Sequence, residues 1–257
     1  MARIRRTGET LQISLRGISK KKLRLALRRG AARWLKLDRD DQLIRSYLAT
    51  PGKKKLQIGC GRHFLPGWLN ADYHPKTRDV LHLDATRRLP FEDAAFDYVF
   101  SEHMIEHFTF PQGQDLLREC FRVLAPGGVA RIVTPDLAFL VDLYRPDEPA
   151  TCERTALQSE FLGYFLDSEI KRRASDAPRD YDTFLINKFV RAWGHQFIYD
   201  EKTLRYAMKE AGFGEVMRCE LMQSVHAELR DLEHVQRKPA GHLALELVVI
   251  EATKPPS

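Results

Sequence analysis

The sequence has few cysteines, and none of them is paired in a motif. Of 257 residues only four are cysteines, and they are widely spaced with no Cys-x-x-Cys pair: Cys60, Cys120, Cys152 and Cys219. This pattern excludes a disulfide scaffold and a cysteine-ligated zinc cluster. It indicates a protein of a reducing compartment.

Long apolar runs are also missing. No stretch approaches the roughly 18–20 apolar residues that a membrane span requires, and no signal-peptide core is visible. We therefore expect a cytoplasmic protein of one α/β domain with extensions. An arginine-rich, acid-poor beginning is also seen in organellar transit segments, a less favoured alternative.

Acidic residues are scarce near the N-terminus. Residues 1–36 contain twelve lysines and arginines but only one acid, Glu9, which gives about +11. Because the whole chain carries +6, the rest carries about −5. The basic character thus belongs to an N-terminal arm, and it is weak evidence that the core binds nucleic acid.

The arm has helical periodicity. Apolar residues recur at helical spacing over residues 20–37, among basic residues: Leu23, Leu27, Ala31, Trp34 and Leu35. We predict a basic amphipathic helix there and a second helix over residues 38–49, so that residues 1–50 form a helical extension. Such a helix can lie on a membrane surface, here through residues 16–37, or simply pack on the core.

Strands alternate with helices from residue 51 to 257. A helix is predicted over Gln112–Leu124 and another over Lys202–Ala211, with strands at Lys55–Ile58, Trp68–Tyr73, Val80–Leu83, Asp97–Phe100 and Val129–Val133. This alternation predicts a Rossmann-like, doubly wound and mainly parallel sheet. Strands at Glu215–Leu221 and Leu243–Glu251 would close it as an antiparallel hairpin.

Two regions of this domain are harder to interpret. Residues 136–195 are predicted to be an insertion over the mouth of the pocket, with helices near Leu137–Tyr144 and Leu157–Ile170 and a polar stretch at Lys171–Asp182. The polar segment Arg230–Gly241 is predicted to be a mobile loop.

A glycine turn follows the first predicted strand of the domain. Gly59-Cys60-Gly61 ends Leu56–Gly61, and glycines at this place let the backbone approach a ligand closely. Asp72 ends the second strand, where its carboxylate can accept hydrogen bonds from two ribose hydroxyls. Asp84 ends the third, where it can face an adenine amino group.

Four segments together resemble a known family: Leu56–Gly61, Gly67–Asp72, Leu89–Val99 and Arg122–Gly128. In this order they are similar to the motifs of class I S-adenosylmethionine (SAM)-dependent methyltransferases of the type 11 kind, over residues 54–135. The resemblance implies SAM as the cofactor. The cofactor contacts that it implies are Gln57, Gly59, Cys60, Gly61, Asp72, Asp84, Ala85, Leu89 and Glu102.

The chain departs from this family in two places. Gln57 stands where an acidic residue is common, and its amide oxygen accepts a hydrogen bond from an ammonium more weakly than a carboxylate would. Only 12 residues separate Gly59 from Asp72, and Pro66 breaks any helix between them. The first crossover must therefore be a loop or a single turn, which puts Arg62 and His63 near the cofactor's carboxylate.

Histidines follow the fourth strand in Ser101-Glu102-His103-Met104-Ile105-Glu106-His107. His103 or His107 could act as a general base, since imidazole titrates near neutrality. If a helix begins here, His103, Glu106 and His107 share one face and could bind a divalent metal. The segment resembles the Glu-x-x-Glu-His of metal-using O-methyltransferases, but His103 replaces the first Glu, so a metal is not favoured.

A third histidine lies far away in the sequence. His195 precedes an aromatic stretch and Asp200, which is a good N-cap for the next helix. His195 could complete a cluster with His103 and His107, or it could be structural.

These observations predict a SAM-dependent methyltransferase. The favoured reaction is O-methylation of a small molecule or a glycan precursor. The alternatives are an RNA methyltransferase that uses the basic arm and a non-catalytic SAM-fold binding module. The acidic core disfavours RNA, and the intact Gly59, Gly61, Asp72 and Asp84 disfavour the non-catalytic module.

Overall fold

The computed structural model divides the chain into two units, Met1–Tyr47 and Leu48–Ser257. It describes residues 4–7, 10–13, 39–144, 152–165, 182–237, 239 and 241–256. Within this part of the chain, no helix combines the length and the apolar character needed to cross a bilayer.

The N-terminal unit contains a hairpin that the sequence did not predict. Strands β1 (Ile4–Thr7) and β2 (Thr10–Ile13) pair antiparallel, with Ile4 opposite Ile13. A helix over residues 39–49 agrees with the second predicted helix. The amphipathic helix predicted over residues 20–37, and the membrane contact predicted for residues 16–37, lie outside the described residues.

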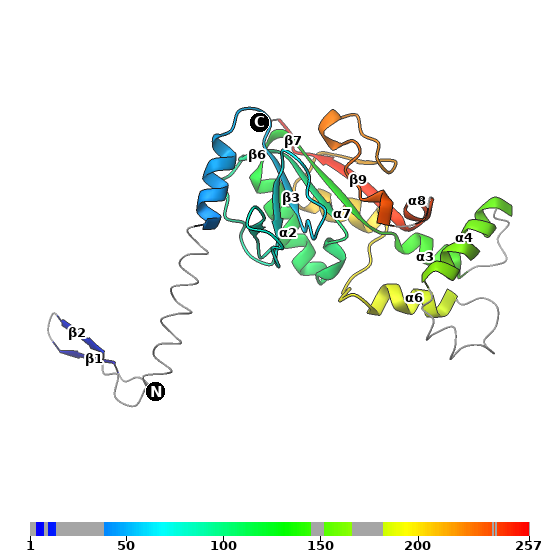
Figure 1. Cartoon of the computed structure of the whole chain (residues 1–257), viewed down its shortest axis with the longest axis horizontal. Coiled ribbons are helices and arrows are strands. Elements are labelled where there is room, and N and C mark those ends of the chain that lie inside the picture. The colour runs from blue at the N-terminus through cyan, green and yellow to red at the C-terminus, as the bar shows by residue number, and fades with distance from the viewer. Residues whose placement is uncertain are drawn as a thin grey trace. The chain divides into compact units, whose positions relative to one another are not determined.

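The second unit is built on a seven-stranded sheet in the order β5-β4-β3-β6-β7-β9-β8 (Figure 1). The five strands from β5 to β7 are parallel, and β9 pairs antiparallel with both β7 and β8. This topology confirms the predicted Rossmann-like sheet with an antiparallel C-terminal hairpin. The strands are β3 (Lys55–Ile58), β4 (Leu69–Asp72), β5 (Leu81–His82), β6 (Phe96–Glu102), β7 (Leu124–Pro135), β8 (Glu215–Arg218) and β9 (Leu247–Thr253).

Helices α2 (Phe110–Val123) and α7 (Glu201–Glu210) pack against each other and against β7 and β9, respectively. Each begins at a side-chain cap, because Thr109 and Gln112 form a reciprocal capping box and Asp200 accepts from the amide of Thr203. Their boundaries agree with the sequence prediction to within about two residues.

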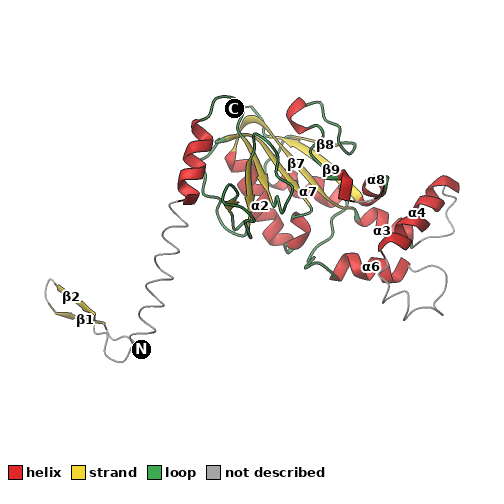
Figure 2. Ribbon diagram, viewed as in Figure 1, coloured by secondary structure: helices red, strands yellow, loops and turns green. Residues whose placement is uncertain are grey.

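The insertion forms a small helical layer with its own core, set apart from the sheet (Figure 2). It comprises α3 (Leu137–Leu143), α4 (Cys152–Phe165) and α6 (Asp182–Arg191). Phe139, Phe161 and Phe189 meet inside it. The sequence predicted α3 closely, placed α4 five residues too late and missed α6.

The end of the chain corrects one prediction. Leu243–Glu251 was expected to be a single strand, but its first part belongs to α8 (His242–Glu246), and β9 begins only at Leu247. Gly241 starts this helix with a φ of +80°, and leucine, alanine and glutamate favour it. The run therefore changes from helical to extended backbone at the buried Glu246, with no glycine or proline to mark the change.

The first crossover, residues 59–68, contains no helix, as predicted. Its buried Leu65 and Trp68 pack instead in one core cluster with Leu229 and Leu232, which come from a segment between β8 and α8. This segment, residues 219–237, is here called the covering segment. It occupies core space next to the crossover, where the sequence predicted only a mobile polar loop beyond Arg230.

A buried ion network fastens the covering segment to the sheet. Arg131 of β7 is fully buried, and its guanidinium donates to Glu233 (2.7 Å), to Glu251 of β9 (2.5 Å) and to the carbonyl of Gln223 (2.9 Å). Burial raises the pKa of Glu233, although the charge of Arg131 works in the opposite direction. One charged residue of this segment, Glu233, thus serves a buried partner rather than solvent.

Candidate functional site

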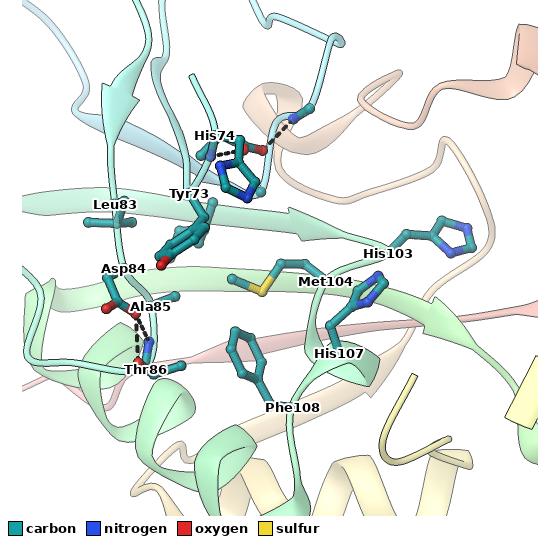
Figure 3. A pocket seen from close by; sticks show the side chains of 14 residues that line it. Tyr73, His74, Leu83, Asp84, Ala85, Thr86, His103, Met104, His107 and Phe108 are labelled. Carbon is teal, nitrogen blue, oxygen red and sulfur yellow. Dashed lines mark hydrogen bonds between the residues drawn. The ribbon is translucent and has the colours of Figure 1, made fainter. Parts of the chain in front are cut away.

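Most of the residues predicted to bind the cofactor lie at the carboxyl ends of β3, β4, β5 and β6. A cavity of about 640 Å³ opens there (Figure 3). In parallel sheets this edge is the usual place for a ligand. The cavity is lined by Ile58, Gly59, Gly61, Asp72, Tyr73, His74, Leu83, Asp84, Ala85, Thr86, His103, Met104, His107 and Phe108.

Gly59 is required by its backbone conformation and by a close neighbour. Its φ is +77°, and a Cβ at this position would lie 2.6 Å from Cγ of Met104. The amides of Gly59 and Cys60 both donate to the carbonyl of Ala71, which holds the turn against β4. Gly61 has a φ of +54°, but a Cβ added to it would meet no atom within 4 Å.

We expect Gly59→Ala to lower the free energy of unfolding more than Gly61→Ala. Both substitutions place a Cβ in the left-handed region, which costs about 1–2 kcal/mol. Only Gly59→Ala adds the overlap with Met104. Urea unfolding of the two variants measures the difference, and equal losses would show that the close approach of Met104 is unimportant.

Each of the two predicted acids accepts hydrogen bonds from nearby loop residues. Asp72 accepts hydrogen bonds from the amides of Gly61 (2.9 Å) and His74 (2.7 Å). Asp84 accepts from the hydroxyl (2.6 Å) and the amide of Thr86, and these bonds, with the charge of Arg87, hold the pKa of Asp84 below its ordinary value. Both side chains are therefore fixed carboxylates at the cavity wall.

A second cavity of about 220 Å³ adjoins the first at the glycine turn, since both are lined by Gly59, Gly61 and His103. Gln57 is 3% exposed here, and its Oε1 has no hydrogen-bond partner among the described residues. Burial raises the pKa of the Cys60 thiol to about 12, so it lines the cavity as a neutral group. The other lining residues are Arg62, His63, Glu102 and His234.

His103 lies between the two cavities and is held by a buried carboxylate. Its Nδ1 is 3.1 Å from Oε1 of Glu106, while the other oxygen of Glu106 accepts from the hydroxyl of Thr134 (2.9 Å). Because a carboxylate only accepts, Nδ1 of His103 carries the proton and Nε2 presents a lone pair. That Nε2 is buried and has no partner among the described residues.

The charge of Glu106 is maintained although its side chain is fully buried. Burial acts to raise its pKa, but the hydrogen bond from His103 and the nearby histidines outweigh that effect, so the pKa lies below its ordinary value. His103 has a φ of +49°, an unfavourable conformation for a residue with a side chain. The surrounding structure thus fixes an ionised carboxylate behind a strained histidine.

The two remaining histidines lie next to each other. The rings of His107 and His195 are 5.0 Å apart, edge to face. His195 donates from Nδ1 to the carbonyl of Phe189 (2.5 Å), and burial lowers its pKa, so the neutral ring keeps a lone pair on Nε2. His107 lines the larger cavity and His195 stands behind it.

The structure corrects the predicted metal face. The helical turn η1 (Ile105–His107) begins only at Ile105, so His103 lies outside it and does not share a helical face with Glu106 and His107. His195 takes its place, because ligand atoms of Glu106, His107 and His195 lie within 4.8 Å of one another. Both oxygens of Glu106 already accept hydrogen bonds, one from His103 and one from Thr134. This arrangement favours a role for Glu106 as the partner of His103 over a role as a metal ligand.

Most of the predicted site residues therefore meet, but Leu89 and His195 line neither of the described cavities. The larger cavity brings together Gly59, Gly61, Asp72, Asp84, Ala85, His103 and His107, and the smaller one adds Gln57, Cys60 and Glu102. Leu89 lines neither of these cavities, since its amide donates to Glu119 and its carbonyl accepts from Arg122.

Sequence reasoning missed some lining residues. Tyr73 and His74 follow Asp72 directly, and Met104 and Phe108 flank the histidine motif, so their positions next to predicted residues were a usable signal. His234 is different. It lies 171 residues beyond His63, whose ring it contacts, and no local pattern marks it.

Comparison with known proteins finds a methyltransferase domain in the segment that contains most of these residues. Residues 56–132 match the family model described as a methyltransferase domain. The match runs from β3 into β7, so it contains the glycine turn, both acids and the Glu106–His107 pair. The match shows a methyltransferase domain in this part of the chain, and together with the strand order of the sheet it supports a class I SAM-dependent methyltransferase. No curated protein sequence matches the chain.

Among solved structures, a possible exported protein from Bordetella parapertussis is 14% identical, with 85% of this chain and 67% of that chain covered and a TM-score of 0.46. A SAM-dependent methyltransferase from Thermotoga maritima, described as a possible histamine N-methyltransferase, is 19% identical, with 88% and 95% covered and a TM-score of 0.40. The family match, and not these distant similarities, carries the assignment.

A third solved structure contains the cofactor itself. It is Haemonchus contortus phosphoethanolamine N-methyltransferase 2 in complex with SAM, which is 17% identical, with 85% of this chain and 52% of that chain covered and a TM-score of 0.38. The present chain thus spans about half the length of that protein.

Proposed function

We propose that this methyltransferase transfers the methyl group of SAM to a hydroxyl oxygen of a small-molecule or glycan acceptor, with His103 as the general base. The observation that carries the proposal is the buried, unpartnered Nε2 of His103, held by the ionised Glu106. A hydroxyl is a poor nucleophile until its proton leaves, so an oriented imidazole suits this acceptor.

The residues present fit SAM. The unpartnered Oε1 of Gln57 can accept from the ammonium of the cofactor, and the glycine turn leaves space that a side chain at Gly61 would enter. Asp72 retains lone pairs for the ribose hydroxyls, and Asp84 and Ala85 lie where the adenine is expected. When bound, SAM supplies an activated methyl group on a positively charged sulfur.

The protein contributes position and a proton acceptor. His103 lines both cavities, and we propose that an acceptor hydroxyl bound in the larger cavity forms a hydrogen bond to its Nε2. The proton of the hydroxyl passes to Nε2 as the oxygen forms its bond to the methyl carbon and the bond from that carbon to sulfur breaks. Glu106 stabilises the imidazolium that results.

His107 and His195 are proposed as further acceptor-side groups. His107 lines the larger cavity, and the hydrogen bond from His195 to Phe189 fixes the orientation of the second ring. The core is mildly acidic, which argues against RNA as the acceptor, because RNA enzymes need basic surface around the pocket.

The test is a transfer assay with radiolabelled SAM and three panels of acceptors: hydroxylated small molecules, glycans and RNA. We expect label in the first or second panel, and the label should disappear with His103→Ala. Label in RNA alone would contradict the proposed acceptor, and transfer that survives His103→Ala unchanged would contradict the proposed base.

A further inference from the structure

The covering segment, residues 219–237, reaches the glycine turn as well as the core. The ring of His234 stacks on that of His63, with centroids 4.7 Å apart and planes at 7°. His63 donates from Nε2 to the carbonyl of Leu232 (3.0 Å), since a carbonyl oxygen only accepts. The amide of His234 donates to Glu102 (3.3 Å). The covering segment is therefore bonded to two residues that line the smaller cavity, His63 and Glu102.

Buried contacts hold the residues that precede His234 in the covering segment. Glu233, directly before His234, is held by the buried Arg131 of β7 through a bond of 2.7 Å. Leu229 and Leu232 are buried against Leu65 of the first crossover. Buried contacts hold Leu232 and Glu233, which precede His234, and Leu65, which follows His63. The stacked rings of His234 and His63 therefore have a defined position at the cavity wall.

The smaller cavity has a lining with two chemical characters. The lining includes two acceptors, the unpartnered Oε1 of Gln57 and the carboxylate of Glu102. It also includes Arg62, an exposed guanidinium that forms no ion pair with any described residue, and the stacked imidazoles of His63 and His234. A ligand that carries an ammonium and a carboxylate on one carbon atom matches this arrangement.

We propose that the covering segment replaces the missing crossover helix as the wall of a subsite for the amino-acid end of SAM. In this subsite Arg62 donates to the cofactor's carboxylate and His234 shields that contact from water. Charge-assisted hydrogen bonds are the stronger kind, and removal from solvent strengthens them further. The inference rests on the proposed function, because it assumes that SAM occupies the adjoining cavity.

The test is calorimetry with two ligands that differ only in the proposed contact. S-adenosylhomocysteine carries the amino-acid end, and methylthioadenosine lacks it. We expect Arg62→Gln to weaken S-adenosylhomocysteine binding by about 10- to 100-fold, which corresponds to one lost hydrogen bond to a charged group. His234→Ala should weaken it about tenfold. Methylthioadenosine should bind all three proteins equally well.

His226→Ala is the matched control, since His226 belongs to the same segment but lines neither described cavity. It should bind both ligands like the wild type. If His234→Ala or Arg62→Gln weakens both ligands equally, the subsite is refuted and the variants only loosen the fold. If the wild type binds the two ligands equally tightly, the subsite is refuted while the cofactor site stands. If the wild type binds neither, the proposed function fails and the subsite fails with it.

Discussion

His103→Ala is expected to lower kcat by about 10²- to 10⁴-fold, which is the usual contribution of a positioned general base. His103 lines both described cavities, and the orientation of its imidazole depends on Glu106. Steady-state kinetics with an acceptor found in the transfer assay measures the effect. The loss should fall mainly on kcat, because S-adenosylhomocysteine binding does not use the proton acceptor.

Two further variants make this result specific. Glu106→Gln keeps the shape of the side chain but removes the charge that holds the proton on Nδ1, so it should also lower kcat and shift the pH profile. His82→Ala removes a histidine from β5 that lines neither described cavity, and it should retain activity. A kcat of His103→Ala within about twofold of the wild type would rule out general-base catalysis by His103, since a positioned base contributes far more.

Arg131→Met is expected to lower the free energy of unfolding by about 3–5 kcal/mol, because removing one partner leaves buried charges uncompensated. Arg131 donates to two carboxylates, Glu233 and Glu251, and all three side chains are almost fully buried. The variant should also release the covering segment and weaken S-adenosylhomocysteine binding. Urea unfolding followed by circular dichroism measures the stability.

A control arginine and a rescue separate this effect from general damage. Arg118→Met removes a guanidinium whose partner, Asp115, is exposed, so it should change the stability by less than about 1 kcal/mol. Replacing Glu233 and Glu251 by leucine as well as Arg131 by methionine should restore much of the loss, since an apolar set needs no charge compensation. Equal losses for Arg131→Met and Arg118→Met would show that the buried network contributes nothing special.

The sequence was sufficient for the cofactor edge of the sheet. Strands of parallel sheets end at one edge, so the order of Gly59, Asp72 and Asp84 along the chain already implies that they meet in space. The structure places all three at the larger cavity. The missing crossover helix was also predictable, because Pro66 lies within too short a connection.

The rest depended on information that is not local. His103 was placed on a helical face from its spacing, but the helical turn begins only at Ile105, and His103, with a φ of +49°, lies outside it. The ring of His195 contacts that of His107 although the two residues are 88 positions apart in the sequence. Only the tertiary fold brings them together. The covering segment looked like a polar loop, although Glu233 within it is buried against Arg131, a partner 102 residues away in the sequence.

The central claim is that this site binds SAM, and calorimetry with S-adenosylhomocysteine tests it most directly. We expect the wild type to bind one molecule per chain, and Asp72→Asn to bind it roughly 10- to 100-fold more weakly, because the carboxylate that would receive the ribose hydroxyls loses its charge. Asp72→Asn keeps an oxygen that can accept from the amide of Gly61 or His74, so the turn should remain folded. No binding by the wild type, or undiminished binding by Asp72→Asn, would contradict the claim.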